Sequence, residues 1–302
     1  MALLITGSIG IDTVTTPHGR ATDVLGGCAS YSAYAAAWFT PVRLVGVVGE
    51  DFPAEFRAIL DEREIDLRGV EVRRGSHTFR WVARFEGDMN VAETLPETKL
   101  NVLAEEAPRV PATFADSRTV FLANTHPTLQ RELLSQLRGP QLVVCDTMNL
   151  WIETQRESLL ETLRLTTGAI INDGEARQLT GKVNLIEAGE AVLTLGPRFV
   201  IIKKGEHGAL LVTPDGADAL PAFPAKVVRD PTGAGDSFGG AVMGYLHAQG
   251  RADRDTLRRA IVRGTVTASF TIEDFSLARL RRLSRAEFDQ RVEQYVRMLR
   301  IE

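Results

Sequence analysis

The sequence predicts an α/β fold of three layers, in which a central, mostly parallel sheet lies between helices, together with a small β-sheet lid. Two patterns support this prediction. Short, continuously apolar segments alternate with helical segments along most of the chain, and one segment with a period of two residues interrupts them. The 302 residues, 44% of them hydrophobic, suffice for one large core, so we expect a single domain over 1–302.

The apolar segments are short enough to be buried strands. They cover residues 2–6, 42–49, 119–123, 141–146, 168–172 and 199–204. Helices are expected between them at 28–39, 127–137, 151–163 and 185–194. Continuous apolar strands separated by helices indicate a parallel sheet that is covered on both faces. A last helix is expected after a capping box of Ser284 and Glu287, with an apolar face of Phe288, Val292, Tyr295 and Leu299 that we expect only to pack.

Residues 70–88 predict a β-hairpin. In its second strand Phe79, Trp81, Ala83 and Phe85 alternate with more polar residues, so one face of the strand is aromatic. Three roles stay open for this hairpin, namely a lid, a dimer contact or a satellite sheet on the main core. We expect the lid to come from segments near 12–25 and 70–100.

Composition excludes several classes of protein. A net charge of −4 and a pI near 5.8 argue against a nucleic-acid-binding protein, and the basic run from Arg279 to Arg285 is interpreted as a solvated helix end and loop. Cys28 and Cys145 are far apart and show no metal-site spacing, so both are expected to be reduced, as in a cytoplasmic protein. No signal peptide and no membrane-spanning stretch is predicted. The histidines show no metal spacing either; they are His18, His77, His126, His207 and His247.

Residues 229–246, RDPTGAGDSFGGAVMGYL, combine a glycine turn with an acidic helix start. Gly233, Ala234 and Gly235 let the backbone bend sharply, and the free N–H groups of the following helix then form an anion site. Asp236 suits phosphoryl transfer as the carboxylate that accepts the proton of an attacking hydroxyl. Taken alone, a G-x-G-D segment is more simply a helix cap. Later glycines of this helix are expected to allow close packing; they are Gly239, Gly240 and Gly244.

The whole stretch resembles the C-terminal signature of the ribokinase-like (PfkB-type) carbohydrate kinase family, D-T-x-G-A-G-D before a helix of small and aromatic residues. The resemblance implies that Asp236 is the catalytic base and that Gly233, Ala234 and Gly235 supply the anion hole. Thr232 lies in the same signature and is assigned to ATP binding.

Further segments resemble the family in the same order along the chain. GSIGID (7–12) and GGCASYSAYAA (26–36) are similar to its substrate-binding segments, which implies that Asp12, Gly26 and Gly27 contact the acceptor. The family usually has an asparagine that contacts the sugar at the position of Tyr31, and this departure leaves the identity of the acceptor open. CDTMN (145–149) is similar to the family's D-x-N strand end, which implies that Asp146 and Asn149 face the phosphoryl or substrate side.

The nucleotide side shows similar matches. INDGEARQLTG (171–181) resembles the family's N-x-x-E segment, in which Asn172 would contact ATP and Glu175 would hold Mg²⁺ largely through water. VIIKKGEHGALL (200–211) resembles the nucleotide strand and turn, which assigns Lys203 and Gly205 to ATP. The resemblance therefore implies ATP and Mg²⁺ as cofactors, and it admits a monovalent cation such as K⁺. The segment that lines the adenine pocket in the family has no residue-by-residue match here.

The predicted activity is ATP-dependent phosphorylation of a hydroxyl, in particular a primary CH₂OH. A small sugar is the preferred acceptor by a narrow margin, and a nucleoside is the alternative because the aromatic face with Trp81 suits stacking on a base. That face equally suits a homodimer through the lid. A non-catalytic regulator on the same scaffold is disfavoured, because Asp236, Asn172 and Glu175 are all present. G-x-x-G at Gly7 lacks the spacing of a dinucleotide site, and a Walker A loop is absent.

Overall fold

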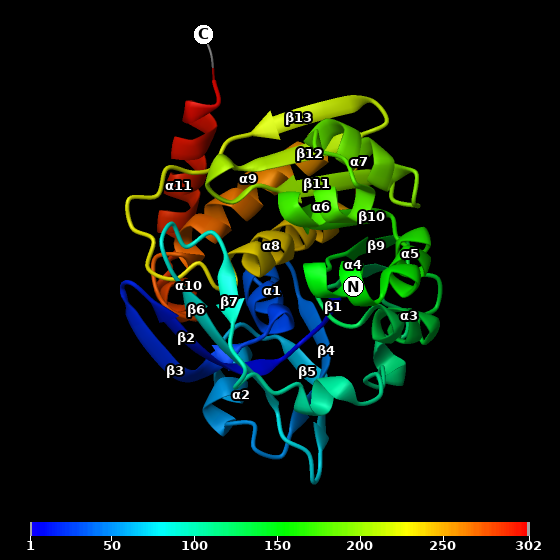
Figure 1. Cartoon of the computed structure of the whole chain (residues 1–302), viewed down its shortest axis with the longest axis vertical. Coiled ribbons are helices and arrows are strands. Elements are labelled where there is room, and N and C mark those ends of the chain that lie inside the picture. Colours follow the sequence, from blue (N-terminus) through cyan, green and yellow to red (C-terminus); the bar gives the residue numbers. More distant parts are fainter. Residues whose placement is uncertain (1, 301–302) are drawn as a thin grey trace.

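A computed structural model describes residues 2–300 (Figure 1). Its main sheet has nine strands in the order β13-β12-β11-β10-β9-β8-β1-β4-β5. All neighbours pair in parallel except β12 and β13, which continue the sheet antiparallel from β11. The strands are β1 (Leu3–Thr6), β4 (Val42–Gly49), β5 (Asp66–Arg73), β8 (Thr119–Leu122), β9 (Leu142–Cys145), β10 (Gly168–Asn172), β11 (Phe199–Lys203), β12 (Ala209–Thr213) and β13 (Gly216–Leu220).

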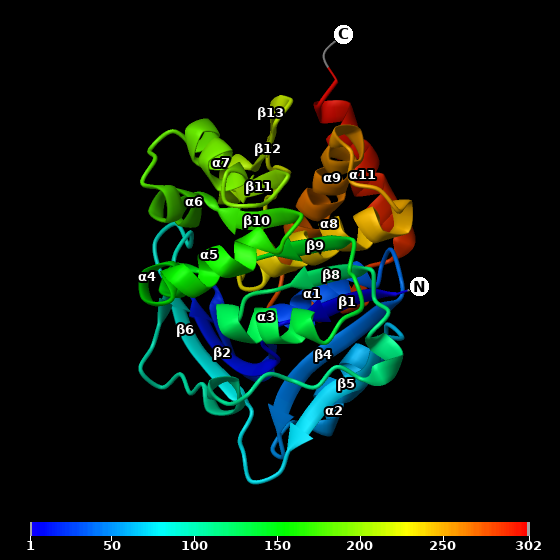
Figure 2. The same cartoon turned by 90° about the vertical axis from the view of Figure 1, so that its right-hand side faces the viewer.

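Helices cover both faces of this sheet (Figures 1 and 2). One layer contains α1 (Cys28–Ala36), α2 (Ala54–Asp61), α8 (Ala234–Gln249), α9 (Arg254–Thr271), α10 (Ala278–Arg282) and α11 (Arg285–Met298). The other contains α3 (Pro127–Ser135), α4 (Asn149–Thr154), α5 (Arg156–Arg164), α6 (Asp173–Thr180) and α7 (Leu185–Leu193). Strand residues alternate between the two cores, so that Leu3 and Ile5 face α1 and α8 whereas Leu4 faces the second layer. The predicted three-layer fold is confirmed.

A second, smaller sheet has the order β3-β2-β6-β7, formed by β2 (Gly10–Thr16), β3 (Gly19–Gly26), β6 (Phe79–Phe85) and β7 (Ala92–Thr94). Figure 1 shows it at the lower left of the molecule, apart from the large sheet. The predicted hairpin over 70–88 is wrong. β5 instead runs parallel to β4 in the large sheet, because Leu67 and Val70 pack into its core, while β6 pairs with β2 and β7.

A second correction concerns the helix expected at 151–163. The chain forms two helices there, α4 and α5, because Gln155 takes non-helical angles of φ −134° and ψ 33° between them. The C-terminal capping box of Ser284 and Glu287 is present, as predicted. Phe288 and Tyr295 of α11 are buried against the first core.

Close packing of α8 against α1 depends on glycine. A Cβ on Gly240 would lie 2.1 Å from the backbone oxygen of Ser32, and one on Gly244 would lie 2.8 Å from the backbone oxygen of Ala36. Both positions therefore have no room for a side chain, which confirms the packing role predicted for these glycines. α8 is thereby held directly over the centre of the sheet.

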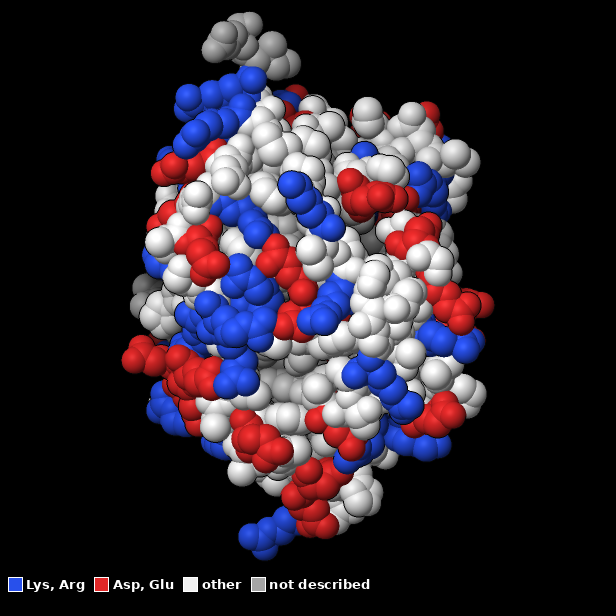
Figure 3. Space-filling model, turned by 90° about the vertical axis from the view of Figure 1, so that its left-hand side faces the viewer, with Lys and Arg blue, Asp and Glu red and all other residues white. Residues whose placement is uncertain are grey.

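The surface agrees with the expectation of a solvated basic run. On the face shown in Figure 3, basic and acidic side chains lie interspersed. Each arginine of the run has a carboxylate within 3.1 Å: Arg279 has Glu273, Arg281 has Glu62, Arg282 has Asp274 and Arg285 has Asp289. These pairs leave no continuous cationic strip along the run. Within residues 2–300, none of the helices has the length and apolar character needed to cross a bilayer.

Candidate active site

A buried ion pair marks the carboxyl ends of the central strands. Lys203 ends β11, and its Nζ lies 3.0 Å from Oδ2 and 3.2 Å from Oδ1 of Asp146, which directly follows β9. The side chains are 17% and 4% exposed, respectively. The Nζ atom also lies 3.4 Å from the point where a Cβ on Gly235 would be. The pair therefore borders the glycine turn that begins α8, at the edge of the sheet where ligands of open α/β folds bind.

The turn itself requires glycine. Gly233 has φ 72°, a left-handed conformation, and it is the N-cap of α8. A Cβ there would lie 2.3 Å from the ring of Tyr31. Among the described residues, the amides of Gly235 and Asp236 have no hydrogen-bond acceptor, whereas the Ser237 amide donates to the backbone oxygen of Gly233. Free amides at the positive end of a 16-residue helix form an anion site.

Asp236 lies in the first turn of α8, as predicted. The pKa of its carboxyl is raised to about 7, mainly by burial and in addition by the nearby Asp146, while Lys203 opposes both effects. A carboxylate with a pKa near neutrality suits general base catalysis at physiological pH. Ser32 fixes the backbone here, because its hydroxyl donates to the backbone oxygen of Asp236 at 3.0 Å.

A second buried carboxylate lies on the small sheet. Asp12 is 2% exposed, and a Cβ on Gly26 would lie 1.9 Å from its Cγ, so glycine is required for the carboxylate to lie against this backbone. The Asp12 pKa is raised to about 8, mainly by burial; the Gly27 amide opposes the shift, and the charges of Asp230 and Asp236 contribute to it. Its Oδ1 has no partner in the described structure. An unpaired buried acceptor suits a ligand hydroxyl.

The aromatic side chains of β6 share a face with Asp12. The parallel register of β2 and β6 pairs Gly10 with Phe79 and Asp12 with Trp81. Paired residues of neighbouring strands project to the same side of a sheet, so the aromatic side chains of β6 and the Asp12 side chain lie on one face of the small sheet. Farther along the same face, Phe85 packs in a small cluster that includes Val228, a residue of the loop that leads to α8. This end of the aromatic face therefore lies against the loop that leads to α8.

Asn172 and Glu175 form a capping box at the start of α6. Asn172 Oδ1 accepts from the Glu175 amide at 2.7 Å, and Glu175 Oε2 accepts from the Asn172 amide at 2.6 Å. Burial raises the Glu175 pKa to about 7, and Lys203 opposes this shift. Within residues 2–300 no group of three or more His, Cys, Asp or Glu side chains could hold a metal ion by itself. One carboxylate with an amide oxygen nearby nevertheless fits Mg²⁺, which keeps several waters and takes further oxygens from phosphates.

A model of the pfkB family carbohydrate kinases matches residues 8–280. The chain belongs to this family. The predicted family, fold and kinase activity are thereby confirmed. Kinases of the pfkB family use ATP, and a ribokinase from Cryptococcus neoformans has been solved in complex with ADP.

Known relatives include kinases of nucleosides. The chain is 29% identical over 277 residues to the cytidine kinase of Thermococcus kodakarensis. This alignment covers 86% of this chain and 94% of that protein. The nucleoside kinase of Burkholderia thailandensis in complex with inosine has a TM-score of 0.79 at 22% identity, over 97% of this chain and 98% of that chain. Aminoimidazole riboside kinase from Salmonella enterica has a TM-score of 0.79 at 18% identity, over 97% and 100%. The structural similarities show a common fold.

In this pfkB kinase, most residues predicted for the site gather at the same edge of the sheet; their individual roles stay predictions. Tyr31 lies beneath the Gly233 turn and is 2% exposed. Thr232 is buried, and its Oγ1 has no partner among the described residues. Asn149 is exposed at the start of α4.

Gly205 is an exposed turn residue with φ 54°, immediately after β11 and Lys204. The loop between β6 and β7 reaches it, since a Cβ there would lie 3.4 Å from Oδ1 of Asn90, and the Asn90 amide donates to Glu206 at 3.4 Å. No sequence signal singled out Asn90, because only the fold brings the β6–β7 loop to the turn after β11. The β6–β7 loop of the small sheet therefore contacts the turn that follows β11.

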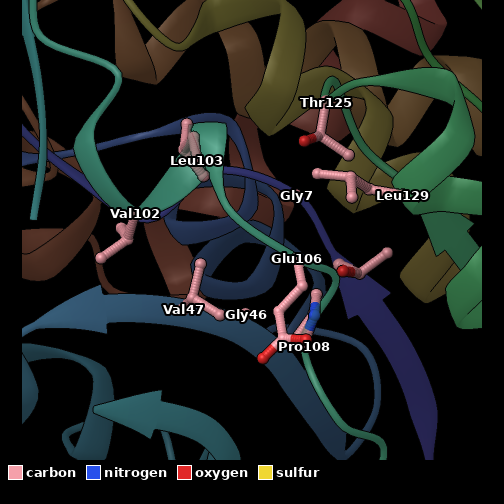
Figure 4. Close-up of a pocket in the computed structure, with 10 residues that line it drawn as sticks. Gly7, Gly46, Val47, Val102, Leu103, Glu106, Pro108, Thr125 and Leu129 are labelled. Carbon is pink, nitrogen blue, oxygen red and sulfur yellow. The ribbon is translucent and has the colours of Figure 1, made fainter. Parts of the chain in front are cut away.

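A small cavity lies at the carboxyl ends of β1 and β4 (Figure 4). Its volume is about 20 Å³, which suits a single water but no acceptor. Gly7, Gly46 and Thr125 are among the residues that line it, and Asp236 is not. A larger hollow of about 570 Å³ lies at the opposite edge of the sheet, between Arg131, Arg164 and Arg198. Neither feature contains the buried carboxylates.

Proposed function

We propose that this pfkB kinase transfers the γ-phosphoryl group of ATP to a primary hydroxyl of a nucleoside, with Asp236 as the general base. The observation that carries the proposal is the arrangement of Asp236 beside the unpaired amides of the Gly233 turn. The amides would stabilise the charge on the moving phosphoryl group while the carboxylate takes the hydroxyl proton. In a loose transition state proton removal is late, so a carboxylate is a sufficient base.

The cofactors fit the same residues. The phosphates of ATP would lie between the Gly233 turn and the ends of β10 and β11, in reach of Asn172, Thr232, Lys203 and Gly205. Glu175 would hold Mg²⁺, mainly through water. Bound there, Mg²⁺ would neutralise part of the charge on the phosphate oxygens. The acceptor would lie against Gly26 and Gly27, with a hydroxyl on the unpaired Oδ1 of Asp12.

A nucleoside replaces the free sugar as the preferred acceptor for two reasons. The aromatic face with Trp81 shares its side of the small sheet with Asp12, so a ring carried by the acceptor would meet that face. The cytidine kinase of T. kodakarensis is similar over most of both chains. The aromatic face is thereby less suited to a homodimer contact, since it turns inward.

The test is an ADP-release assay with ATP, Mg²⁺ and a panel of cytidine, inosine, adenosine, free pentoses and free hexoses. We expect turnover with at least one nucleoside and a higher kcat/KM than with each free sugar. A preference for a free sugar would overturn the acceptor assignment and leave the kinase intact. ATP binding without turnover across the panel would instead favour a regulatory protein and contradict the proposed catalysis.

A further inference from the structure

Besides Asp146, two further carboxylates influence the buried ammonium group of Lys203. The ammonium group pairs with Asp146 at the end of β9, and the charges of Glu175 in α6 and Asp236 in α8 also act on it. Burial alone would lower the Lys203 pKa, but these three carboxylates raise it above its usual range, so the side chain is charged at neutral pH. The ammonium group is therefore a charged hydrogen-bond donor in a buried site, where solvent weakens its contact with an anionic oxygen only little.

The alternation of side chains along β11 places Lys203 on the side of the sheet that carries the glycine turn. Along β11, Ile201 faces the core that contains α8 and Ile202 faces the other core, so Lys203 projects toward α8. Asp146 follows Val144 on the same side of β9. The two side chains therefore meet under Gly235, where Nζ lies 3.4 Å from the Cβ position.

The ammonium group has donor capacity left. Of its three N–H groups at most two are used, since the hydrogen bonds of Nζ in the described structure are the two to Asp146. The amides of Gly235 and Asp236 on the neighbouring helix turn are also unpaired. Three unused donors from β11 and α8 therefore lie close together at the glycine turn.

We propose that Lys203 is a further catalytic residue that contacts the transferred phosphoryl group, and that Asp146 is the positioning residue that holds it there. This inference rests on the proposed function. In the reaction the acceptor oxygen forms a bond to the γ-phosphorus, the bond from that phosphorus to the β–γ bridging oxygen breaks, and the hydroxyl proton goes to Asp236. Lys203 donates no proton; its charge offsets the charge that develops on the phosphoryl oxygens.

The test compares Lys203→Met, Asp146→Asn and the double variant with the wild-type enzyme. We expect Lys203→Met to lower kcat by about 10²–10³, the usual effect of removing one such donor. Asp146→Asn should lower kcat by about tenfold, with Asp146→Glu partly restoring it. Arg198→Met, which removes an exposed cation at the other end of β11, should leave kcat unchanged.

The double variant separates catalysis from folding. Removing one partner of a buried pair leaves an uncompensated charge, whereas removing both relieves it. We therefore expect the double variant to melt close to the wild-type temperature and to remain as slow as Lys203→Met. A double variant that regains wild-type kcat would reduce the pair to a structural role and overturn the proposal.

Binding measurements keep the inference separate from the proposed function. We expect calorimetric titration without acceptor to show that the ratio of ATP affinity to ADP affinity is about tenfold lower in Lys203→Met than in the wild type, because the contact is to the γ-phosphoryl group. An unchanged preference would overturn the role of Lys203 even if the wild-type enzyme is an active kinase. If the wild-type protein turns over no acceptor, the proposed function fails, and the ATP-to-ADP ratio still decides the contact.

Discussion

The pKa of Asp236 predicts the pH dependence of catalysis. Its carboxyl has a pKa of about 7, raised mainly by burial, and the base must be ionised to accept a proton. About one molecule in ten is then ionised at pH 6, and about nine in ten at pH 8. We expect kcat/KM for the acceptor to rise by about tenfold between pH 6 and 8 and to level off above. An ordinary surface aspartate would be ionised throughout this range and would give no such rise.

The assay is a pH series of kcat/KM at saturating ATP, with ATP affinity measured separately at each pH as a control. Glu175 titrates in the same range, so the variant Asp236→Asn is needed to assign the effect. It should lower kcat by about 10²–10⁴, keep ATP affinity within a few fold and make the remaining acid limb shallower. Near-normal turnover by Asp236→Asn, or an acid limb of unchanged slope, would refute the role of Asp236.

Three further predictions concern the acceptor side and the packing of α8. Trp81→Ala should raise the KM for a nucleoside by about three- to tenfold, as expected for a lost stacking contact, whereas Arg84→Ala on the opposite face of β6 should not; equal effects of the two would argue against stacking. Gly240→Ala should lower the free energy of unfolding by about 1–3 kcal/mol through overpacking against α1, measured by chemical denaturation. Gly250→Ala has open space, so only its left-handed backbone opposes the change, and a larger loss there would contradict the packing argument. For Asp12→Asn, the melting temperature of the variant minus that of the wild type should increase from about pH 5 to about pH 8. The reason is that folded Asp12 stays protonated to about pH 8, whereas the unfolded residue ionises near pH 4, so the wild type loses stability over this range. A difference in melting temperature that does not change with pH would contradict the burial effect.

Elements with strong local signals were predictable from the sequence. The strands that became β1, β4, β8, β9, β10 and β11 are runs of buried apolar residues, and their ends agree within two residues. The turn before α8 was predictable because Gly233 needs a left-handed backbone and Asp236 follows it directly. In such segments local preference and tertiary environment favour the same structure.

Other features depend on partners distant in the chain. Residues 70–88 look like a hairpin, yet Val70 pairs with β4 and Trp81 with β2, and only the full fold decides between neighbouring and distant strand partners. Helix α9 has a mixed pattern that gave no periodic signal, although much of it is buried. The pairing of Lys203 with Asp146 joins residues 57 positions apart, and no spacing rule connects them.

The central claim is that phosphate passes from ATP to a primary hydroxyl next to Asp236. The most direct measurement is ³¹P NMR of the product formed from ATP and the best acceptor by equal amounts of wild-type enzyme and Asp236→Asn. We expect a phosphomonoester whose phosphorus is coupled to the protons of one CH₂ group, formed at least 10²-fold faster by the wild-type enzyme. Phosphate on a different position, or equal rates for the two proteins, would contradict it.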